Sequence, residues 1–295
     1  MVDFSVIIAT YNRADYLREC LNSLVSQTYK NFETVIVDDG STDNTKDVVD
    51  EFVNLLSIKY IKIPNSGYPA IPRNIGAKNA SAQWLCFLDS DDKWTTDKLK
   101  TCFSFLCDYD VIYHKLKYFG IGKPFYRIVL ASRQVHSPVF TDLITNGNGI
   151  PLSGSLIRKS IFFQVNGFDE DILLAAVEDY DLWLKISRIT ERFIFIPKVL
   201  GFYRMHKSSI TEHSYKQINK LNFVYTKHLN YLNIHYHEQA AIIKNYYIAI
   251  VHERMKNHKE AIALYKMSFK ANSYKQKIKA GLRIMLIKMK QVLNP

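Results

Sequence analysis

Three aspartates stand within four positions directly after a short apolar run. The run Leu85–Leu88 is typical of a buried strand. It leads into Asp89, Asp91 and Asp92. Two carboxylates about 4 Å apart near a protein surface repel by roughly 4 kcal/mol, so three at one strand end favour a bound cation. Carboxylate oxygens suit Mg²⁺ or Mn²⁺, and Mg²⁺ is usually held by one or two carboxylates together with substrate phosphates. A solvated acidic turn that caps the next helix would use the same residues.

Strand and helix patterns alternate through the first 90 residues. Strands are expected at 4–9, 32–37, 58–63 and 84–88. Helices are expected at 14–27, over the segment that carries Val48 to Val53, and at 73–80. Such alternation predicts βαβ crossovers and a mostly parallel sheet, in which ligands bind outside the carboxyl ends of the strands. Polar motifs follow three of these strands, so we expect 10–13, 38–41 and 89–92 to meet at one edge.

Glycine-rich phosphate loops are absent from the sequence. No GxGxxG follows the first expected strand, and no GxxxxGK[ST] occurs in the chain. The phosphates of a bound nucleotide would therefore be held by a metal and by side chains. Asp38 or Asp39 could accept a hydrogen bond from a base N–H or a ribose hydroxyl, although a plain strand–turn–helix connection would use the same residues.

Seven segments stand in a fixed order between about residues 4 and 211. They are SVIIATYNR (5–13), VDDGSTDNT (37–45), PRNIGAKNA (72–80), FLDSDD (87–92), GFDED (167–171), EDYDLWLK (178–185) and YRMHKSSIT (203–211). Together they resemble the family-2 glycosyltransferases of the GT-A fold. The resemblance implies an α/β protein with a Rossmann-like, mostly parallel mixed sheet flanked by helices. It also implies inverting transfer of a sugar from a nucleotide diphosphate, usually UDP, with a divalent metal.

The resemblance also assigns a donor site, residue by residue. The positions implied to bind the nucleotide sugar are Ala9, Thr10, Tyr11, Asn12, Asp39, Arg73, Asp89 and Ser90. Among them Asp39 matches the residue that recognises the nucleobase, and Arg73 matches the arginine that flanks the nucleotide. Asp89 and Asp91 are the two ends of a DxD motif, in which the first usually faces the ribose and the second the metal. His206 matches a histidine that reaches the diphosphate or the metal in some members, so Asp91 and His206 are the expected ligands of Mn²⁺ or Mg²⁺.

An inverting transfer needs a base that removes the proton of the acceptor hydroxyl and a metal that takes up charge on the leaving diphosphate. The resemblance makes Glu178 and Asp179 the catalytic region, and we expect Asp179 to be the base. Helical spacing would place Asp179 and Trp183 on one face. Trp183 could then stack against an acceptor sugar, but a core position is equally compatible with its spacing.

Composition is that of a folded soluble protein: 295 residues, 47% hydrophobic and 23% charged. No apolar stretch approaches the roughly 20 residues of a membrane span. Asp3 stands where a secretory signal would be basic, and the four cysteines form no CxxC pair. We therefore expect a cytoplasmic protein in a reducing compartment.

Positive charge is concentrated near the C-terminus. Residues 213–295 hold 15 Lys and Arg against 3 Asp and Glu, within a net charge of +11 for the whole chain. We therefore expect a GT-A domain at 1–212 and a basic helical extension at 213–295, with a helical hairpin at 245–253 and 259–270. One apolar helical stripe comprises Ile278, Leu282, Met285, Leu286, Met289 and Leu293. Five bases accompany it: Lys277, Lys279, Arg283, Lys288 and Lys290.

A basic amphipathic helix of this kind predicts binding to an anionic membrane surface, and the alternative is that its stripe packs on the catalytic domain. Nucleic acid is not an expected partner, because the basic region contains no recognisable binding motif.

The sequence thus predicts a metal-dependent inverting hexosyl- or N-acetylhexosaminyltransferase. Its expected donor is a UDP-sugar, and its expected acceptor is a glycan hydroxyl, carried on a polyprenyl diphosphate. Synthesis of a surface polysaccharide such as O-antigen or capsule would place it peripherally on the inner face of the cell membrane. The alternative is a non-catalytic sugar-nucleotide or glycan-binding relative. The presence of both Asp91 and Asp179 favours the enzyme.

Overall fold

The computed structural model describes residues 2–121, 129–130, 132–205 and 214–293. Contacts divide the chain into two compact units. The first comprises Met1–Val135 and Gly149–Ser209, and the second comprises His136–Asn148 and Ile210–Pro295. The expected boundary after residue 212 stays a prediction. Nothing in the sequence pattern indicated that His136–Asn148 would group with the C-terminal helices.

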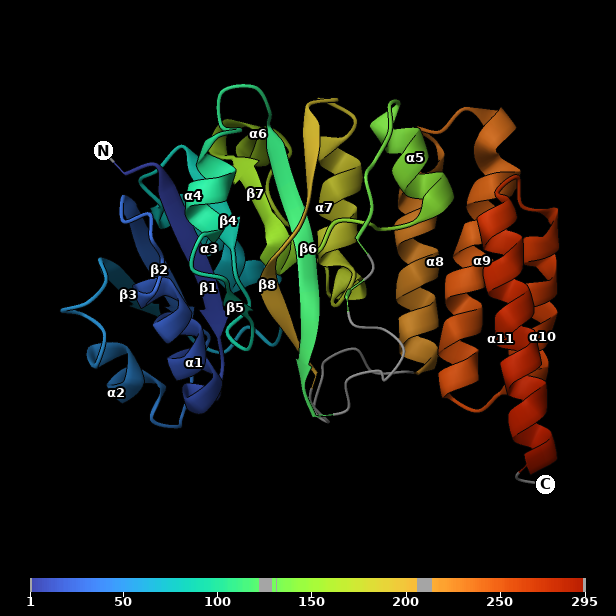
Figure 1. The fold of residues 1–295 in the computed structure, drawn as a ribbon, viewed down its shortest axis with the longest axis horizontal. Helices are drawn as coiled ribbons and strands as arrows, with labels where there is room; N and C mark the ends of the chain where they lie inside the picture. The colour runs from blue at the N-terminus through green and yellow to red at the C-terminus, as the bar shows by residue number, and fades with distance from the viewer. Residues whose placement is uncertain (1, 122–128, 131, 206–213, 294–295) are drawn as a thin grey trace. The chain divides into compact units, whose positions relative to one another are not determined.

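One eight-stranded mixed sheet forms the centre of the first unit (Figure 1). Its strands are β1 (Phe4–Thr10), β2 (Phe32–Asp38), β3 (Ile58–Lys62), β4 (Trp84–Phe87), β5 (Lys93–Trp94), β6 (Val111–Gly120), β7 (Ser155–Arg158) and β8 (Phe193–Met205). They are ordered β3-β2-β1-β4-β7-β6-β8-β5. Strands β1 to β4 pair in parallel, as predicted, whereas β7 runs antiparallel to both β4 and β6. Because β8 pairs in parallel with β6, the carboxyl ends of β1, β2, β4 and β8 all reach one edge.

Helices cover both faces of this sheet. They are α1 (Ala14–Val25), α2 (Thr45–Asp50), α3 (Ala70–Asn79), α4 (Lys98–Phe103), α6 (Lys159–Gln164) and α7 (Glu178–Ile186). The predicted elements of the first 90 residues are confirmed to within a few residues, except that α2 ends before Phe52. The strand residues Phe4, Val6 and Ile8 pack into one core with α1, α2 and α4. On the other face, a Cβ at Gly76 of α3 would lie 2.5 Å from Ile7, so only glycine allows this close approach.

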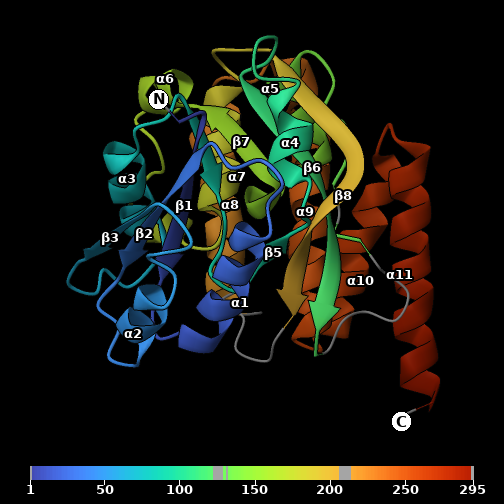
Figure 2. The same ribbon diagram turned by 60° about the vertical axis from the view of Figure 1, so that its left-hand side comes forward.

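Helices make up the second unit. They are α5 (Val139–Asn146), α8 (Tyr215–Leu229), α9 (His237–Arg254), α10 (His258–Met267) and α11 (Tyr274–Leu293). Figures 1 and 2 show α9, α10 and α11 side by side. They share a core of Tyr246, Ala249, Ala261, Tyr265, Ala280 and Ile287. The predicted hairpin is therefore confirmed, although α9 is longer than expected and a 3-10 turn, η4 (Ser268–Lys270), follows α10.

Among the residues described, no helix is both long enough and apolar enough to cross a bilayer. Cys20, Cys86 and Cys102 are buried free thiols and Cys107 is an exposed one, so the first three serve as small core residues, as expected.

Candidate active site

Arg73 joins two of the predicted motifs through its guanidinium group. Its Nη1 donates to Oε1 of Glu178 at 2.6 Å, and its Nη2 donates to Oδ1 of Asp89 at 2.5 Å. The side chains of Arg73 and Glu178 are only 8% and 6% exposed. Helix α3 thus connects the carboxyl end of β4 with the first residue of α7. The expected donor residue and the expected catalytic region therefore lie in one place.

Burial makes this bridge a sensitive point for stability. We expect Arg73→Met to lower the free energy of unfolding by roughly 3–5 kcal/mol, because Glu178 would remain as a buried charge without its partner. Adding Glu178→Gln to that variant should restore much of the loss. Arg18→Met is the matched control: Arg18 pairs with Glu51 at the surface, where solvent screens the charges, so its effect should be much smaller. Urea unfolding at pH 7 measures all three, and equal effects at positions 73 and 18 would contradict the prediction.

Asp179 is the half-buried second residue of α7. Its Oδ1 accepts a hydrogen bond from the backbone N–H of Tyr180 at 2.7 Å. Burial, followed by repulsion from the Glu178 carboxylate, raises the pKa of Asp179 to about 7. A carboxylate with this pKa exchanges protons near neutral pH, as a general base must. The two neighbouring acidic residues therefore differ in their interactions. Glu178 forms an ion pair with Arg73, and Asp179 can take up a proton.

Asp38 and Asp39 also differ in their surroundings. Asp38 is fully buried, and its two carboxylate oxygens accept from the Ser41 backbone N–H and the Tyr60 hydroxyl. Both oxygens are thus already used, one by the turn after β2 and one by strand β3. Asp39 uses Oδ1 to accept from the backbone N–H of Ser66 at 2.7 Å. Of the two, Asp39 has the greater remaining capacity to accept from a nucleotide.

Asn12 fastens the first motif to the second. It adopts a left-handed backbone conformation with φ of 49°, which asparagine tolerates better than most residues. Its Oδ1 accepts from the Thr42 backbone N–H at 2.8 Å, and its own N–H donates to Ser41 Oγ at 2.9 Å. The neighbouring residue Tyr11 is 46% exposed. Asn12 is thus hydrogen-bonded to the loop after β2, whereas Tyr11 is accessible to solvent.

Other expected donor-site residues lie deeper. Thr10 and Ser90 are buried, and Ala9 is partly buried. The carbonyl oxygen of Thr10 accepts from the backbone N–H of Asp39 at 2.9 Å, which aligns the ends of β1 and β2. Thr10 and Ser90 are therefore buried parts of this edge of the sheet rather than surface residues.

Two arginines balance the acidic turn after β4. Arg13 Nη1 contacts Asp91 Oδ2 at 2.6 Å. Arg204, near the end of β8, donates its backbone N–H to Asp92 Oδ1 at 2.8 Å and its Nε to the Asp91 carbonyl oxygen at 2.9 Å. Burial, and then the charges of Asp91 and Asp89, raise the pKa of Asp92 well above its usual range. Arg13, which follows β1, and Arg204, near the end of β8, thus place positive charge beside this turn.

No cluster of three or more His, Cys, Asp or Glu side chains suited to a metal ion occurs in the part of the chain that the structure describes. A site for Mg²⁺ or Mn²⁺ does not require one, because such ions commonly take one or two carboxylates and complete their coordination with substrate phosphates and water. Asp91 fits that pattern, with a carboxylate that is 20% exposed. His206 lies outside the described residues, directly after β8.

Trp183 does not form the expected platform for a sugar. Its side chain is fully buried, and its Nε1 donates to the carbonyl oxygen of Ile150 at 3.0 Å. The hydrophobic ring serves the core, and its N–H is satisfied there. Of the two readings that the sequence allowed, the structure supports the core position.

Asn74 is a positioning residue that sequence reasoning did not single out. Its Nδ2 donates to the Phe168 carbonyl oxygen and to Glu170 Oε1, both at 2.9 Å. Its Oδ1 accepts from the Phe168 backbone N–H at 3.0 Å. Asn74 thereby fixes the GFDED segment against α3. Its place next to Arg73 in a matched motif was the available signal.

Comparison with known proteins gives a consistent picture. The model of the family described as Glycosyl transferase family 2 matches residues 5–163. Glycosyltransferase GlyA of Streptococcus pneumoniae serotype 4 is 31% identical over 221 residues, which is 70% of this chain and 31% of GlyA. The poly(ribitol-phosphate) beta-N-acetylglucosaminyltransferase TarS of Staphylococcus aureus is 41% identical over 122 residues, covering 40% of this chain and 21% of TarS. The chain thus spans a third or less of the length of these two relatives.

Solved structures agree on the fold. The crystal structure of S. aureus TarS 1-349 in complex with UDP-GlcNAc has a TM-score of 0.65 at 23% identity, and the match covers 90% of this chain and 80% of that one. The mannosyltransferase PcManGT from Pyrobaculum calidifontis in complex with GDP-Man and Mn²⁺ has a TM-score of 0.60 at 19% identity, covering 98% and 82%.

Proposed function

The chain belongs to glycosyl transferase family 2, which confirms the expected GT-A fold, and we propose that it transfers a sugar from a nucleotide-diphosphate sugar to a hydroxyl group of a glycan. The observation that carries the proposal is the pairing of a carboxylate of pKa about 7, Asp179, with the Arg73 bridge to Asp89. The buried Arg73 guanidinium holds Asp89 and Glu178, and Glu178 is the immediate neighbour of the proton acceptor Asp179. That arrangement suits a reaction in which an acceptor and a nucleotide sugar must meet.

In the proposed step, Asp179 takes the proton of the acceptor hydroxyl as its oxygen attacks the anomeric carbon. The new C–O bond forms on the face opposite the leaving diphosphate, so the anomeric configuration inverts. Asp91, and His206 where the resemblance holds, would bind Mn²⁺ or Mg²⁺. Such an ion, when bound, neutralises charge on the departing diphosphate. Asp39 would accept from the nucleobase, and Asp89 would face the ribose.

A UDP-sugar is the proposed donor. Support comes from the structural likeness to TarS, whose structure holds UDP-GlcNAc, while the more distant PcManGT structure holds GDP-Man. We expect UDP release from UDP-GlcNAc, UDP-Glc or UDP-Gal in the presence of Mn²⁺ or Mg²⁺, and no GDP release from GDP-Man. A coupled nucleotide-release assay measures this. Binding of UDP-sugars without any release, with or without glycan acceptors, would instead favour a non-catalytic relative.

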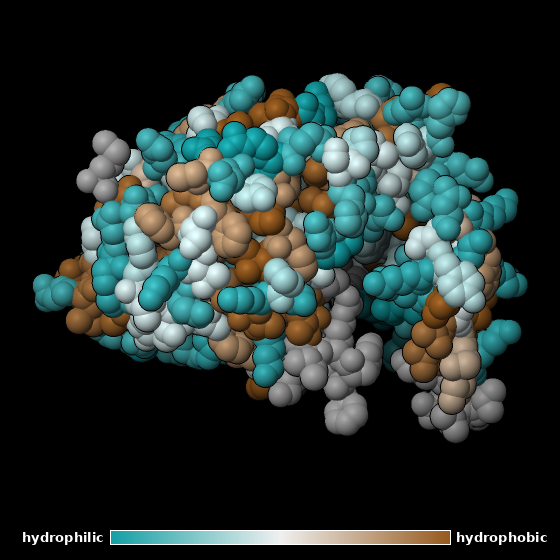
Figure 3. Space-filling model, turned by 45° about the horizontal axis from the view of Figure 1, so that its top comes forward, coloured by the Kyte–Doolittle hydropathy of each residue, from teal (hydrophilic) through white to brown (hydrophobic). Residues whose placement is uncertain are grey.

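We further propose that the acceptor is a lipid-linked glycan and that the protein works at the inner membrane surface. Support comes from the face of α11 that carries the predicted stripe. Ile278, Leu282, Met285, Leu286 and Met289 are 48–51% exposed, and Figure 3 shows apolar side chains at the surface of the C-terminal helices. The opposite side of the helix, with Ala280 and Ile287, packs into the core of its own unit. Within its own unit, the described stripe is therefore not the packing face.

Membrane association can be tested without truncation. Deleting residues 276–295 would remove Ala280 and Ile287 from the core, so a loss of binding would be uninformative. We expect Leu282→Ser with Leu286→Ser to reduce co-sedimentation with anionic liposomes several-fold, because less apolar surface enters the bilayer. Binding of the parent protein should also weaken as salt is raised from 0.1 M, where charges are screened within about 10 Å. Equal sedimentation with neutral and anionic liposomes would contradict the proposal.

A further inference from the structure

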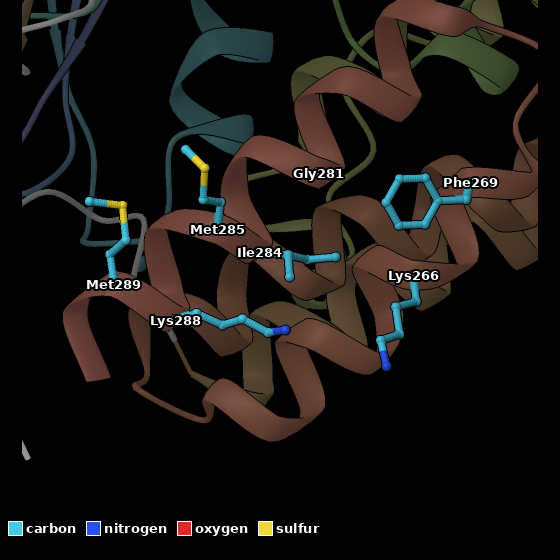
Figure 4. Close-up of a pocket in the computed structure, with 7 residues that line it drawn as sticks. All are labelled: Lys266, Phe269, Gly281, Ile284, Met285, Lys288 and Met289. Carbon is cyan, nitrogen blue, oxygen red and sulfur yellow. The ribbon is translucent and has the colours of Figure 1, made fainter. Parts of the chain in front are cut away.

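An apolar groove lies between α11 and the α10–η4 segment (Figure 4). Its volume is about 670 Å³, within the usual range of sites for small molecules. Apolar side chains dominate its lining: Phe269, Ile284, Met285 and Met289. Phe269, Met285 and Met289 are each about half exposed. Methionine is flexible and adapts to irregular apolar ligands, so this lining suits a hydrocarbon better than a rigid polar molecule.

Two lysines give the groove a charged side. Figure 4 shows Lys288 extending along α11 toward Lys266, with both amines on one side of the groove. No Asp or Glu occurs anywhere from Ala261 to the C-terminus. An anionic group near these amines would therefore meet no acidic neighbour from this part of the sequence. The same charge disfavours a second copy of this helix as the occupant, because two acid-free basic surfaces repel.

We propose that this groove binds the hydrocarbon chain of a single anionic amphiphile, a long-chain alkyl or isoprenoid phosphate, with Lys266 and Lys288 at its phosphate. The inference rests on the proposed function in that such a lipid would carry the acceptor glycan. It differs from adsorption on a bilayer, because Ile278, Leu282 and Leu286 belong to the exposed stripe but do not line the groove.

Gly281 keeps the groove open. A Cβ at this position would lie 3.8 Å from the ring of Phe269, which is ordinary contact, so a larger side chain would extend into the groove. Gly281→Leu should fill the space and also favour the helix, since leucine has a much higher helix propensity than glycine. The variant thus tests the groove without threatening the fold.

The experiment uses the full chain with methionine methyl groups labelled with ¹³C and hexadecyl phosphate below its critical micelle concentration. We expect the NMR signals of Met285 and Met289 to shift on titration, while that of Met255, at the end of α9, stays in place. Inorganic phosphate and hexadecanol are the two partial probes, and each should bind at least tenfold more weakly. Gly281→Leu should weaken binding at least tenfold and Lys288→Gln about threefold or more.

Leu282→Ser is the matched control, because Leu282 is on the exposed stripe and outside the groove. It should bind hexadecyl phosphate like the parent chain. Equal binding by Gly281→Leu, or an equal loss in Leu282→Ser, would mean that the amphiphile adsorbs elsewhere and would overturn the proposal. A shift of the two methyl signals on dilution alone would identify a second copy as the occupant, with the same consequence.

The outcome is separable from that of the proposed function. Asp179→Asn should bind hexadecyl phosphate like the parent chain even if it transfers no sugar. Conversely, a groove that binds no amphiphile would leave UDP release unaffected.

Discussion

Asp179→Asn is expected to lower turnover by at least about 10²-fold, the low end for loss of a general base. The substitution keeps the size of the side chain and removes its capacity to take a proton. Affinity for UDP should barely change, because Arg73 contacts Glu178 and Asp89 rather than Asp179 in the structure. Steady-state kinetics and calorimetric titration with UDP measure the two quantities. A variant that keeps its rate but loses UDP binding would reassign Asp179 to the donor site.

The pH dependence gives a second readout of the same residue. A base works when it is deprotonated, so activity of the parent enzyme should rise with pH through about 7, the pKa of Asp179. The residual activity of Asp179→Asn should lack this rise. Asp15→Asn, at a carboxylate that is 95% exposed, is the control and should keep both the rate and the profile.

The contribution of Asp179 to the free energy of unfolding should fall as pH rises, whereas activity should increase. The folded protein holds the Asp179 proton more tightly than the unfolded chain does, because the folded-state pKa is raised. Ionisation therefore destabilises the fold as pH rises from about 4 to about 7. Asp179→Asn removes this effect, so the variant should be more stable than the parent at pH 8, by on the order of 2 kcal/mol for a half-buried group. At pH 4 the two proteins should be nearly equal in urea unfolding.

Much of the sheet edge at which the polar motifs meet could be predicted, because its strands and turns depend on local patterns. Apolar runs followed by polar motifs identified β1, β2 and β4, and parallel strands bring their carboxyl ends together. The motif order then led to Asp39, Arg73 and Asp179. Each of these side chains lies at a strand end or helix start that the sequence itself marks.

What could not be predicted depends on contacts between distant segments. Trp183 has a helical spacing that fits both a core and a sugar site, and only the position of Ile150 decides between them. Arg73 and Glu178 are 105 positions apart in the sequence, and no periodic residue pattern predicts an ion pair between such distant segments. Similarly, the apolar stripe of α11 was visible in the sequence, but which side of the helix packs depends on Ala280 and Ile287 meeting α9 and α10.

Asp91→Ala is expected to lower transfer by about 10³-fold or more. If Asp91 binds a divalent ion that stabilises the leaving diphosphate, its loss removes several kcal/mol of transition-state stabilisation. The structure offers a competing explanation, since Asp91 also pairs with Arg13 at 2.6 Å. Arg13→Gln separates the two: it breaks the ion pair but keeps the carboxylate.

Transfer by Arg13→Gln should therefore stay within about tenfold of the parent, and it should still require Mn²⁺ or Mg²⁺. The reason is that a partly exposed ion pair contributes only about 1 kcal/mol. Initial rates over a titration of metal ion, after treatment with EDTA, measure both variants. Equal losses at positions 13 and 91 would assign Asp91 to the ion pair. Undiminished transfer by a metal-free parent enzyme in excess EDTA would show that no metal ion takes part in the mechanism. Asp91 would then need another role, because its carboxylate alone would add negative charge beside a departing diphosphate.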